Sequence, residues 1–183
     1  NEAAAAAMLS ASVNYPLRGA VTWKSVVGTN VASDGLSNLA SAGVMGGALI
    51  IVGEDYGEGS SIIQERTHAF AMKSAMCLLD PRPELPTIVQ SVEHAFKLSE
   101  ASNMPVMLEL RIRTCHVHGH FETSANTHPL YSRNDPIQVA DFDPAKVSLP
   151  PATYGQEKHK IEHRFPAAIK YIADNKLNEQ FDG

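Results

Sequence analysis

The sequence has few cysteines, little excess charge and no long hydrophobic run. Its two cysteines, Cys77 and Cys115, are too few for a disulfide framework or a four-cysteine iron–sulfur cluster. Free thiols suggest a reducing compartment, so we expect a cytoplasmic protein. No apolar run approaches the roughly 18 residues that a membrane helix needs, which predicts a soluble chain without a membrane partner. A net charge of -5 argues against nucleic acid as a partner, because that requires a basic face.

The length of 183 residues favours one domain, or one domain with an appendage, and is enough for a buried core. The chain starts at Asn1 and Glu2 without an initiator Met or a charged-then-apolar leader. We therefore expect it to be a piece of a longer protein.

Helix and strand signals alternate over residues 1–122, which predicts an α/β fold with a mainly parallel sheet flanked by helices. The unbroken apolar run 48–52 is typical of a parallel strand that is covered on both faces. Strands are expected at 19–23, 48–52, 76–79 and 105–113. Helices are expected at 3–13, 62–75 and 84–102. A further short helix is expected after the capping side chains between Asn30 and Asp34, ended by Gly43.

The composition changes after residue 120. Six of the 11 prolines lie between residues 129 and 166, which predicts a Pro-rich linker or arm over 123–152 without a core of its own. Helical character resumes in a C-terminal segment, 153–183, with apolar residues that include Ile161 and Phe165 on the side expected to be buried. Pro166 is expected to kink or divide this helix.

The motifs of common nucleotide and acyl-transfer sites are absent. The sequence contains no G-x-x-x-x-G-K-[ST], no G-x-S-x-G and no G-x-G-x-x-G between a strand and a helix. The loop from Glu54 to Ser61 follows a predicted strand, where open α/β sheets usually place their ligands. Its acidic residues argue against a bound phosphate, and a plain strand-to-helix connection explains it equally well.

Two histidine patterns have metal-ligand spacing. Residues 159–163 match H-x-x-E-H, which we interpret as a coincidence because the histidines lie in a solvated, Lys-rich stretch. His116, His118 and His120 alternate, so in an extended segment they share a face and could meet one ion. We favour a hydrogen-bonding role for His116 at the mouth of a site, and we predict no bound metal.

Short motifs along the chain resemble one enzyme family when they are taken in order. They are N-E-A-A from Asn1, G-A-V-T from Gly19, V-G-T-N-V-A-S-D from Val27, G-G-A-L-I-I-V from Gly46 and L-D-P from Leu79. They resemble the pyrimidine-binding domain of thiamine-diphosphate-dependent 2-oxoacid:ferredoxin oxidoreductases, especially the large subunit of indolepyruvate ferredoxin oxidoreductase. The likeness spans nearly the whole chain. It implies oxidative decarboxylation of an arylpyruvate-like 2-oxoacid to acyl-CoA, with coenzyme A as acyl acceptor and ferredoxin as electron acceptor.

The resemblance also implies roles for individual residues. The carboxyl group of Glu2 would bond N1′ of the aminopyrimidine, so that N4′ of the cofactor can act as a base. An acid in this position is otherwise a partner for the helix dipole. Gly28, Asn30 and Asp34 would lie beside the cofactor, although capping of a helix is our preferred role for Asn30 and Asp34. Trp23 is more typical of a core residue than of a stacking platform. The substrate side would be formed by Ser60, Ser61, Gln64 and His116.

Other parts of the family's machinery are missing from the sequence. It has no G-D-G…N motif for Mg²⁺ and diphosphate and no cysteine-rich cluster motif, so the resemblance implies that Mg²⁺ and the iron–sulfur clusters belong to other domains or subunits. The chain should associate with these, with a second copy of itself, or both, and should be inactive alone. Tyr56, Glu58 and Gly59 depart from the family's loop, which affects the expected substrate. Alternatives are a non-catalytic interface module and a thiamine-dependent 2-oxoacid decarboxylase component.

Overall fold

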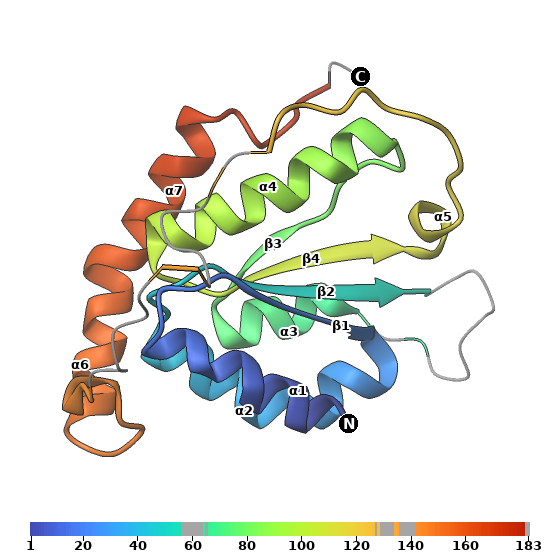
Figure 1. The fold of residues 1–183 in the computed structure, drawn as a ribbon. Helices are drawn as coiled ribbons and strands as arrows, with labels where there is room; N and C mark the ends of the chain where they lie inside the picture. The colour runs from blue at the N-terminus through green and yellow to red at the C-terminus, as the bar shows by residue number, and fades with distance from the viewer. Residues whose placement is uncertain (56–63, 65, 127, 129–133, 136–141, 182–183) are drawn as a thin grey trace.

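A computed structural model describes residues 1–55, 64, 66–126, 128, 134–135 and 142–181. Four parallel strands form one sheet in the order β1-β2-β4-β3, so the two central strands are β2 and β4 (Figure 1). The predicted α/β fold with a parallel sheet is confirmed. The strands are β1 (Gly19–Lys24), β2 (Ala48–Glu54), β3 (Cys77–Leu79) and β4 (Val106–Arg111).

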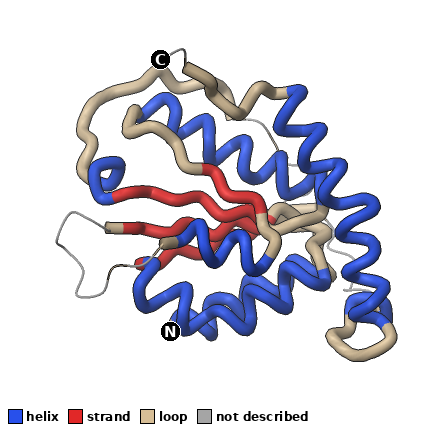
Figure 2. Tube along the Cα trace, turned by 180° about the vertical axis from the view of Figure 1, so that it is seen from behind, coloured by secondary structure: helices blue, strands red, loops and turns tan. Residues whose placement is uncertain are grey.

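Helices cover both faces of the sheet (Figures 1 and 2). One face packs against α1 (Glu2–Leu9), α2 (Asn30–Ala42) and α3 (Thr67–Ser74), and the other against α4 (Leu85–Ser102) and α7 (Phe165–Asp174). None of the described helices combines the length and the hydropathy that a membrane crossing requires. The shorter elements are η1 (Ser10–Val13), η2 (Ser25–Thr29), α5 (Ile112–Cys115), η3 (Pro144–Lys146), α6 (Ala152–His159) and η4 (Lys160–Arg164).

Alternate residues of the central strands supply two separate hydrophobic cores. Ile50 and Val52 of β2 pack with the layer of α1, α2 and α3, whereas Leu49 packs with α4 and α7. In β4, Val106 and Leu108 extend the second core in the same way. Because successive side chains of a strand point to opposite faces, this double coverage explains the unbroken apolar run in β2.

Three expectations for the α/β part are wrong. β1 is an edge strand, so Trp23 is its one buried residue instead of the whole run. The last strand ends at Arg111, before residue 113, because the chain turns into the short helix α5. The helix expected over 62–75 starts at Thr67 in the described part of the chain, since residues 64 and 66 are not helical and 56–63 and 65 lie outside it.

The C-terminal helical segment buries the expected side only in part. Phe165 packs against the second core as expected, whereas Ile161 is 60% exposed. Lys160 and Arg164 are almost fully buried instead, and the guanidinium of Arg164 donates to backbone carbonyls of α2. The helix is divided just before Pro166, as expected. α6 ends at His159, the π-helical turn η4 follows, and Pro166 lies in the first turn of α7, where its missing N–H is tolerated.

Candidate functional site

The structure brings several of the predicted site residues to the carboxyl edge of the sheet. α1 precedes β1 and packs against it, so Glu2 in the first turn of α1 lies near the end of β1 (Figure 1). The turn η2 and the start of α2 follow β1 directly and place Gly28 and Asn30 at the same edge. Open α/β sheets bind their ligands at this edge, because the strand-to-helix loops leave a crevice there.

Glu2 is half-buried on a helix that is firmly placed. Ala6 and Leu9 of α1 are buried against the core, and the side chain of Asn1 caps the helix by accepting a hydrogen bond from the N–H of Ala4 (3.0 Å). The carboxylate of Glu2 has no hydrogen bond or ion pair with any other described residue. A positioned carboxylate without a partner at this edge fits the need of an aminopyrimidine nitrogen.

Gly28 has a packing role in addition to any role near a cofactor. A Cβ atom at this position would lie 2.3 Å from Cγ of Trp23, so a side chain cannot fit there without moving the indole. Trp23 is buried, and its Nε1 donates a hydrogen bond to Oγ1 of Thr29 (3.1 Å). The prediction that Trp23 is a core residue is confirmed.

The expected capping role of Asn30 and Asp34 is wrong. Asn30 is the first residue of α2, and Thr29 occupies the position before it without a side-chain cap. Asp34 is exposed in the second turn, where its carbonyl oxygen accepts a hydrogen bond from Nδ2 of Asn38 (3.0 Å). The helical turn η2 runs directly into α2, so the first N–H groups of α2 do not need a side-chain acceptor.

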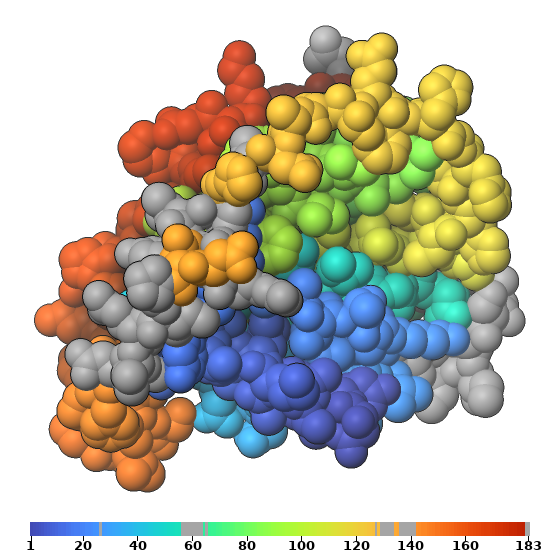
Figure 3. Space-filling model, viewed as in Figure 1, coloured from blue at the N-terminus to red at the C-terminus, as the bar shows by residue number. Residues whose placement is uncertain are grey.

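The substrate-side residues and the histidine patterns do not form a site by themselves. Ser60 and Ser61 lie outside the described residues, and Gln64 and His116 are exposed. The imidazoles of residues 116, 118 and 120 do not come within metal-ligand distance of one another. The segment that carries them leaves α5 and runs across α4 toward residue 126 (Figures 1 and 3). The rings at 159 and 163 are 5.0 Å apart without a third ligand from the described residues.

A buried cluster of ionisable side chains at the same edge was missed by the sequence analysis. Glu54 ends β2 and Glu109 lies near the end of β4, and both are buried. His68, in the first turn of α3, places its Nδ1 3.3 Å from Oε2 of Glu109. One glutamate within each of two otherwise apolar central strands was the signal that could have revealed this cluster.

Few polar groups compensate the buried charges of Glu54 and Glu109. The N–H of Thr67 donates a hydrogen bond to Oε2 of Glu54 (2.6 Å), but Oε1 of Glu54 and both oxygens of Glu109 accept none. Nε of Arg111 lies 3.3 Å from Oε1 of Glu109, although its guanidinium donates to both oxygens of Asp80. Burial, followed by repulsion from Glu54 and Asp80, raises the pKa of Glu109 to about 7, and Arg111 opposes this rise.

A cavity of about 460 Å³ adjoins the cluster. Glu54, Asp80 and Arg111 line it together with the start of α5, so carboxylates and a guanidinium face one space at the carboxyl edge. This arrangement can bind a polar molecule or exchange a proton with one.

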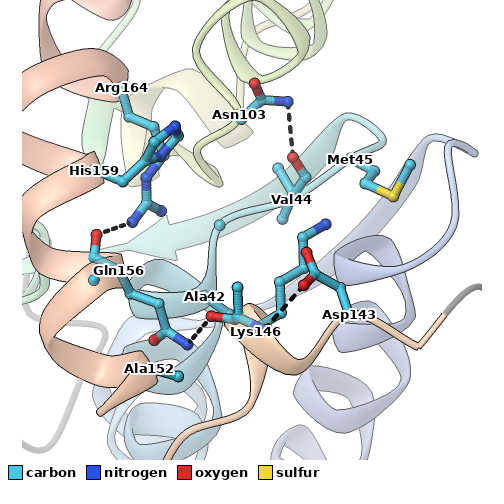
Figure 4. A pocket seen from close by; sticks show the side chains of 13 residues that line it. Ala42, Val44, Met45, Asn103, Asp143, Lys146, Ala152, Gln156, His159 and Arg164 are labelled. Carbon is cyan, nitrogen blue, oxygen red and sulfur yellow. Dashed lines mark hydrogen bonds between the residues drawn. The ribbon is translucent and has the colours of Figure 1, made fainter. Parts of the chain in front are cut away.

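A second cavity, of about 530 Å³, lies at the opposite edge of the sheet (Figure 4). It is lined by the end of α2 and by η3 and α6. Asn103 donates a hydrogen bond to the carbonyl of Val44 (2.9 Å), and Arg164 donates one to the carbonyl of Gln156 (2.8 Å). These polar groups are bonded to the backbone. The cavity at the carboxyl edge is therefore the better candidate site.

Comparison with curated proteins identifies related chains. The chain is 26% identical over 162 residues to indolepyruvate oxidoreductase subunit IorA of Methanothermobacter thermautotrophicus, a match that covers 88% of this chain and 25% of that protein. The IorA subunit of Methanothermobacter marburgensis is 33% identical over 54% of this chain and 16% of its own length. The IorA subunit of Pyrococcus horikoshii is 30% identical over 55% of this chain and 15% of its own length. The chain is similar in sequence to part of IorA.

This homology confirms the family resemblance. The chain spans a quarter or less of the length of these IorA proteins, so it corresponds to one portion of such a subunit. No family model and no solved structure matches the chain.

Glu109 should give the chain a distinctive pH dependence of stability. The pKa of an unfolded glutamate is about 4.3, whereas burial raises the pKa of Glu109 in the fold to about 7. Between these values only the unfolded chain loses the proton, so the free energy of unfolding falls as the pH rises. The substitution Glu109→Gln removes this loss of stability, which reaches about 3–4 kcal/mol above pH 7 and vanishes below pH 4.

Denaturant unfolding with a chelator at pH 4 and pH 8 measures this effect. We expect Glu109→Gln to match the wild type at pH 4 and to exceed it at pH 8. The exposed Glu84 provides a control, since Glu84→Gln should leave the difference between the two pH values unchanged. A wild-type protein and a Glu109→Gln variant with parallel pH profiles would contradict the prediction.

Proposed function

We propose that the chain is the aminopyrimidine-binding part of a thiamine-diphosphate-dependent oxidoreductase. The enzyme would oxidatively decarboxylate an arylpyruvate-like 2-oxoacid such as indolepyruvate to acyl-CoA and pass the electrons to ferredoxin. The observation that carries the proposal is the homology to proteins named indolepyruvate oxidoreductase subunit IorA, which extends over 88% of the chain. The placement of Glu2 at the carboxyl edge of the sheet supports it.

Glu2 would hold a proton at N1′ of the aminopyrimidine. Thiamine diphosphate, when bound, supplies the carbon nucleophile for the 2-oxo group. To share its proton with a ring nitrogen, Glu2 must be shielded from water, because burial favours the protonated form of a carboxyl group. Glu2 is only half-buried in the chain alone. The surface of another domain or subunit must therefore complete the shield.

The other predicted residues would act around this contact. Gly28 keeps the chain close beneath the indole of Trp23 and so fixes the turn beside the cofactor. Asn30 and Asp34 would position the cofactor from α2. Ser60, Ser61, Gln64 and His116 would contribute to the substrate side.

The remaining parts of the enzyme would come from partners. The names of the curated relatives describe subunits, which supports an assembly of several chains. We propose that other domains or subunits hold the diphosphate, its Mg²⁺ and the iron–sulfur clusters, that the assembly contains more than one copy of this chain, and that it works in the cytoplasm.

Reconstitution tests this proposal. The assembled enzyme should reduce an electron-accepting dye when given indolepyruvate and coenzyme A, lose this activity when thiamine diphosphate is removed, and regain it on addition. The 183-residue chain alone should show no turnover under the same conditions, because Glu2 is not shielded. Activity of the assembly that survives removal of thiamine diphosphate would contradict the proposal. Activity without an electron acceptor would indicate a decarboxylase instead.

A further inference from the structure

We propose that Glu54, His68 and Glu109 bind one divalent transition-metal ion. One ligand atom from each of the three side chains lies within 4.8 Å of the other two. The residues come from β2, α3 and β4, so the packing of three separate elements holds them in place. This site is independent of the proposed role of Glu2 in thiamine diphosphate binding.

The distances fit a metal centre. Nitrogen and oxygen ligands lie about 2.0–2.2 Å from a zinc ion, which puts neighbouring ligand atoms about 3–3.5 Å from each other. Nδ1 of His68 and Oε2 of Glu109 are already 3.3 Å apart. The ligand atom of Glu54 lies within 4.8 Å of the other two, so a rotation of this side chain would bring it to the same spacing.

The unpartnered oxygens point to a missing ligand. Oε1 of Glu54 and both oxygens of Glu109 are inaccessible to solvent and accept no hydrogen bond. Buried polar atoms are nearly always satisfied, and an unsatisfied one costs about 1–3 kcal/mol, more when it is charged. A metal ion bound between the two carboxylates removes this cost.

Neighbouring polar groups lie against two of the three proposed ligands. The N–H of Thr67 binds Oε2 of Glu54 (2.6 Å) and leaves Oε1 for the ion. Nε2 of His68 lies 3.9 Å from Oδ2 of Asp80, on the side opposite the Nδ1 that faces Glu109. A carboxylate behind a metal-binding imidazole is a recurring arrangement, because it fixes the tautomer of the ring.

The local charge favours a cation. Three carboxylates, those of Glu54, Asp80 and Glu109, lie together here, and Arg111 compensates only part of their charge through its contacts with Asp80 and Glu109. Glu54 and Glu109 lie beside the imidazole of His68. Their mixed oxygen and nitrogen donors suit Zn²⁺, Mn²⁺ or Fe²⁺ better than Mg²⁺ or Ca²⁺, which prefer oxygen alone.

Two cavities adjoin the site and leave room for a further ligand. Glu54 lines the cavity of about 460 Å³, His68 lines another of about 470 Å³, and Asp80 lines both. Three protein ligands leave at least one coordination position open, as in catalytic zinc sites. An ion here would face the space at the carboxyl edge of the sheet.

Titration of the metal-stripped full chain with Zn²⁺, and with Co²⁺ for its visible absorption, tests the proposal. The histidines at 116, 118, 120, 159 and 163 could bind zinc on the surface, so the measurements use a background in which all five are replaced by Gln. We expect this background protein to bind one equivalent of Zn²⁺, and we expect Mg²⁺ not to displace the zinc. Each of Glu54→Gln, His68→Gln and Glu109→Gln should weaken binding by about 100-fold or more, which exceeds the typical effect of losing a second-shell group.

Matched controls separate loss of the site from loss of the fold. Glu84→Gln and His128→Gln replace an exposed carboxylate and an exposed imidazole, and should leave the zinc affinity unchanged. Glu109→Gln preserves the shape of the side chain, and far-UV circular dichroism verifies its fold. Absence of stoichiometric zinc binding by the background protein that lacks the five histidines would overturn the proposal. Equal zinc affinity of this background protein and its three ligand variants would also overturn it.

Discussion

Replacing Arg164 by alanine is expected to lower the free energy of unfolding by about 3–5 kcal/mol. Arg164 is 3% exposed, and its guanidinium donates hydrogen bonds to the carbonyls of Ala40 (3.1 Å), Ser41 (2.8 Å) and Gln156 (2.8 Å). Each bond from a charged donor contributes about 1.5–3 kcal/mol, and the three contributions are not additive because they share one group. The substitution leaves all three carbonyls without this donor.

The position of Arg164 explains why the effect should be large. Ala40 and Ser41 lie in the last turn of α2, where the unsatisfied carbonyls and the helix dipole both favour a buried cation. The same side chain therefore joins the C-terminal helical segment to the α/β core. Arg164→Lys should recover only part of the stability, since an ammonium group cannot reproduce the planar fork of a guanidinium.

Chemical denaturation of the wild type, Arg164→Ala and Arg82→Ala provides the comparison. Arg82 pairs with Glu84 and Glu179 on the surface, where solvent and salt screen such pairs and leave them little effect on stability. We expect Arg82→Ala to be close to the wild type. A loss of less than about 1 kcal/mol in Arg164→Ala would show that Arg164 does not hold the C-terminal helices to α2.

The local elements of the fold could be predicted because their signals are local. The apolar run 48–52 and the helical periodicity of 84–102 each specify one element, and β2 and α4 confirm them within two residues. The orientation of the C-terminal helices could be predicted only in part. Phe165 and Ile172 face the core as their spacing indicates, but the burial of Arg164 against the carbonyls at the end of α2 depends on contacts between distant segments.

The candidate site was predicted in part. The family resemblance selected Glu2, and the order of α1, β1 and α2 brings Glu2, Gly28 and Asn30 to one edge of the sheet. Glu54 and Glu109 were missed because they are 55 positions apart in the chain. Only the pairing of β2 with β4 and the packing of α3 reveal that they meet.

Replacing Glu2 by glutamine is expected to lower kcat of the assembled enzyme by about 10²–10³-fold, the range for loss of a positioned acid or base. Glutamine keeps the size of the side chain but cannot share a proton with N1′. The assembly should remain intact, because Ala6 and Leu9, not Glu2, pack α1 against the core. Size-exclusion chromatography verifies this, and Glu84→Gln provides a control for an exposed glutamate on the same chain.

The rate of indolepyruvate-dependent dye reduction by the intact Glu2→Gln assembly therefore tests the central claim most directly. The account predicts a loss of at least about 100-fold with thiamine diphosphate present at saturation. A rate within a few-fold of the wild type would contradict it, and would identify the chain as a structural module of the complex without a catalytic carboxyl group.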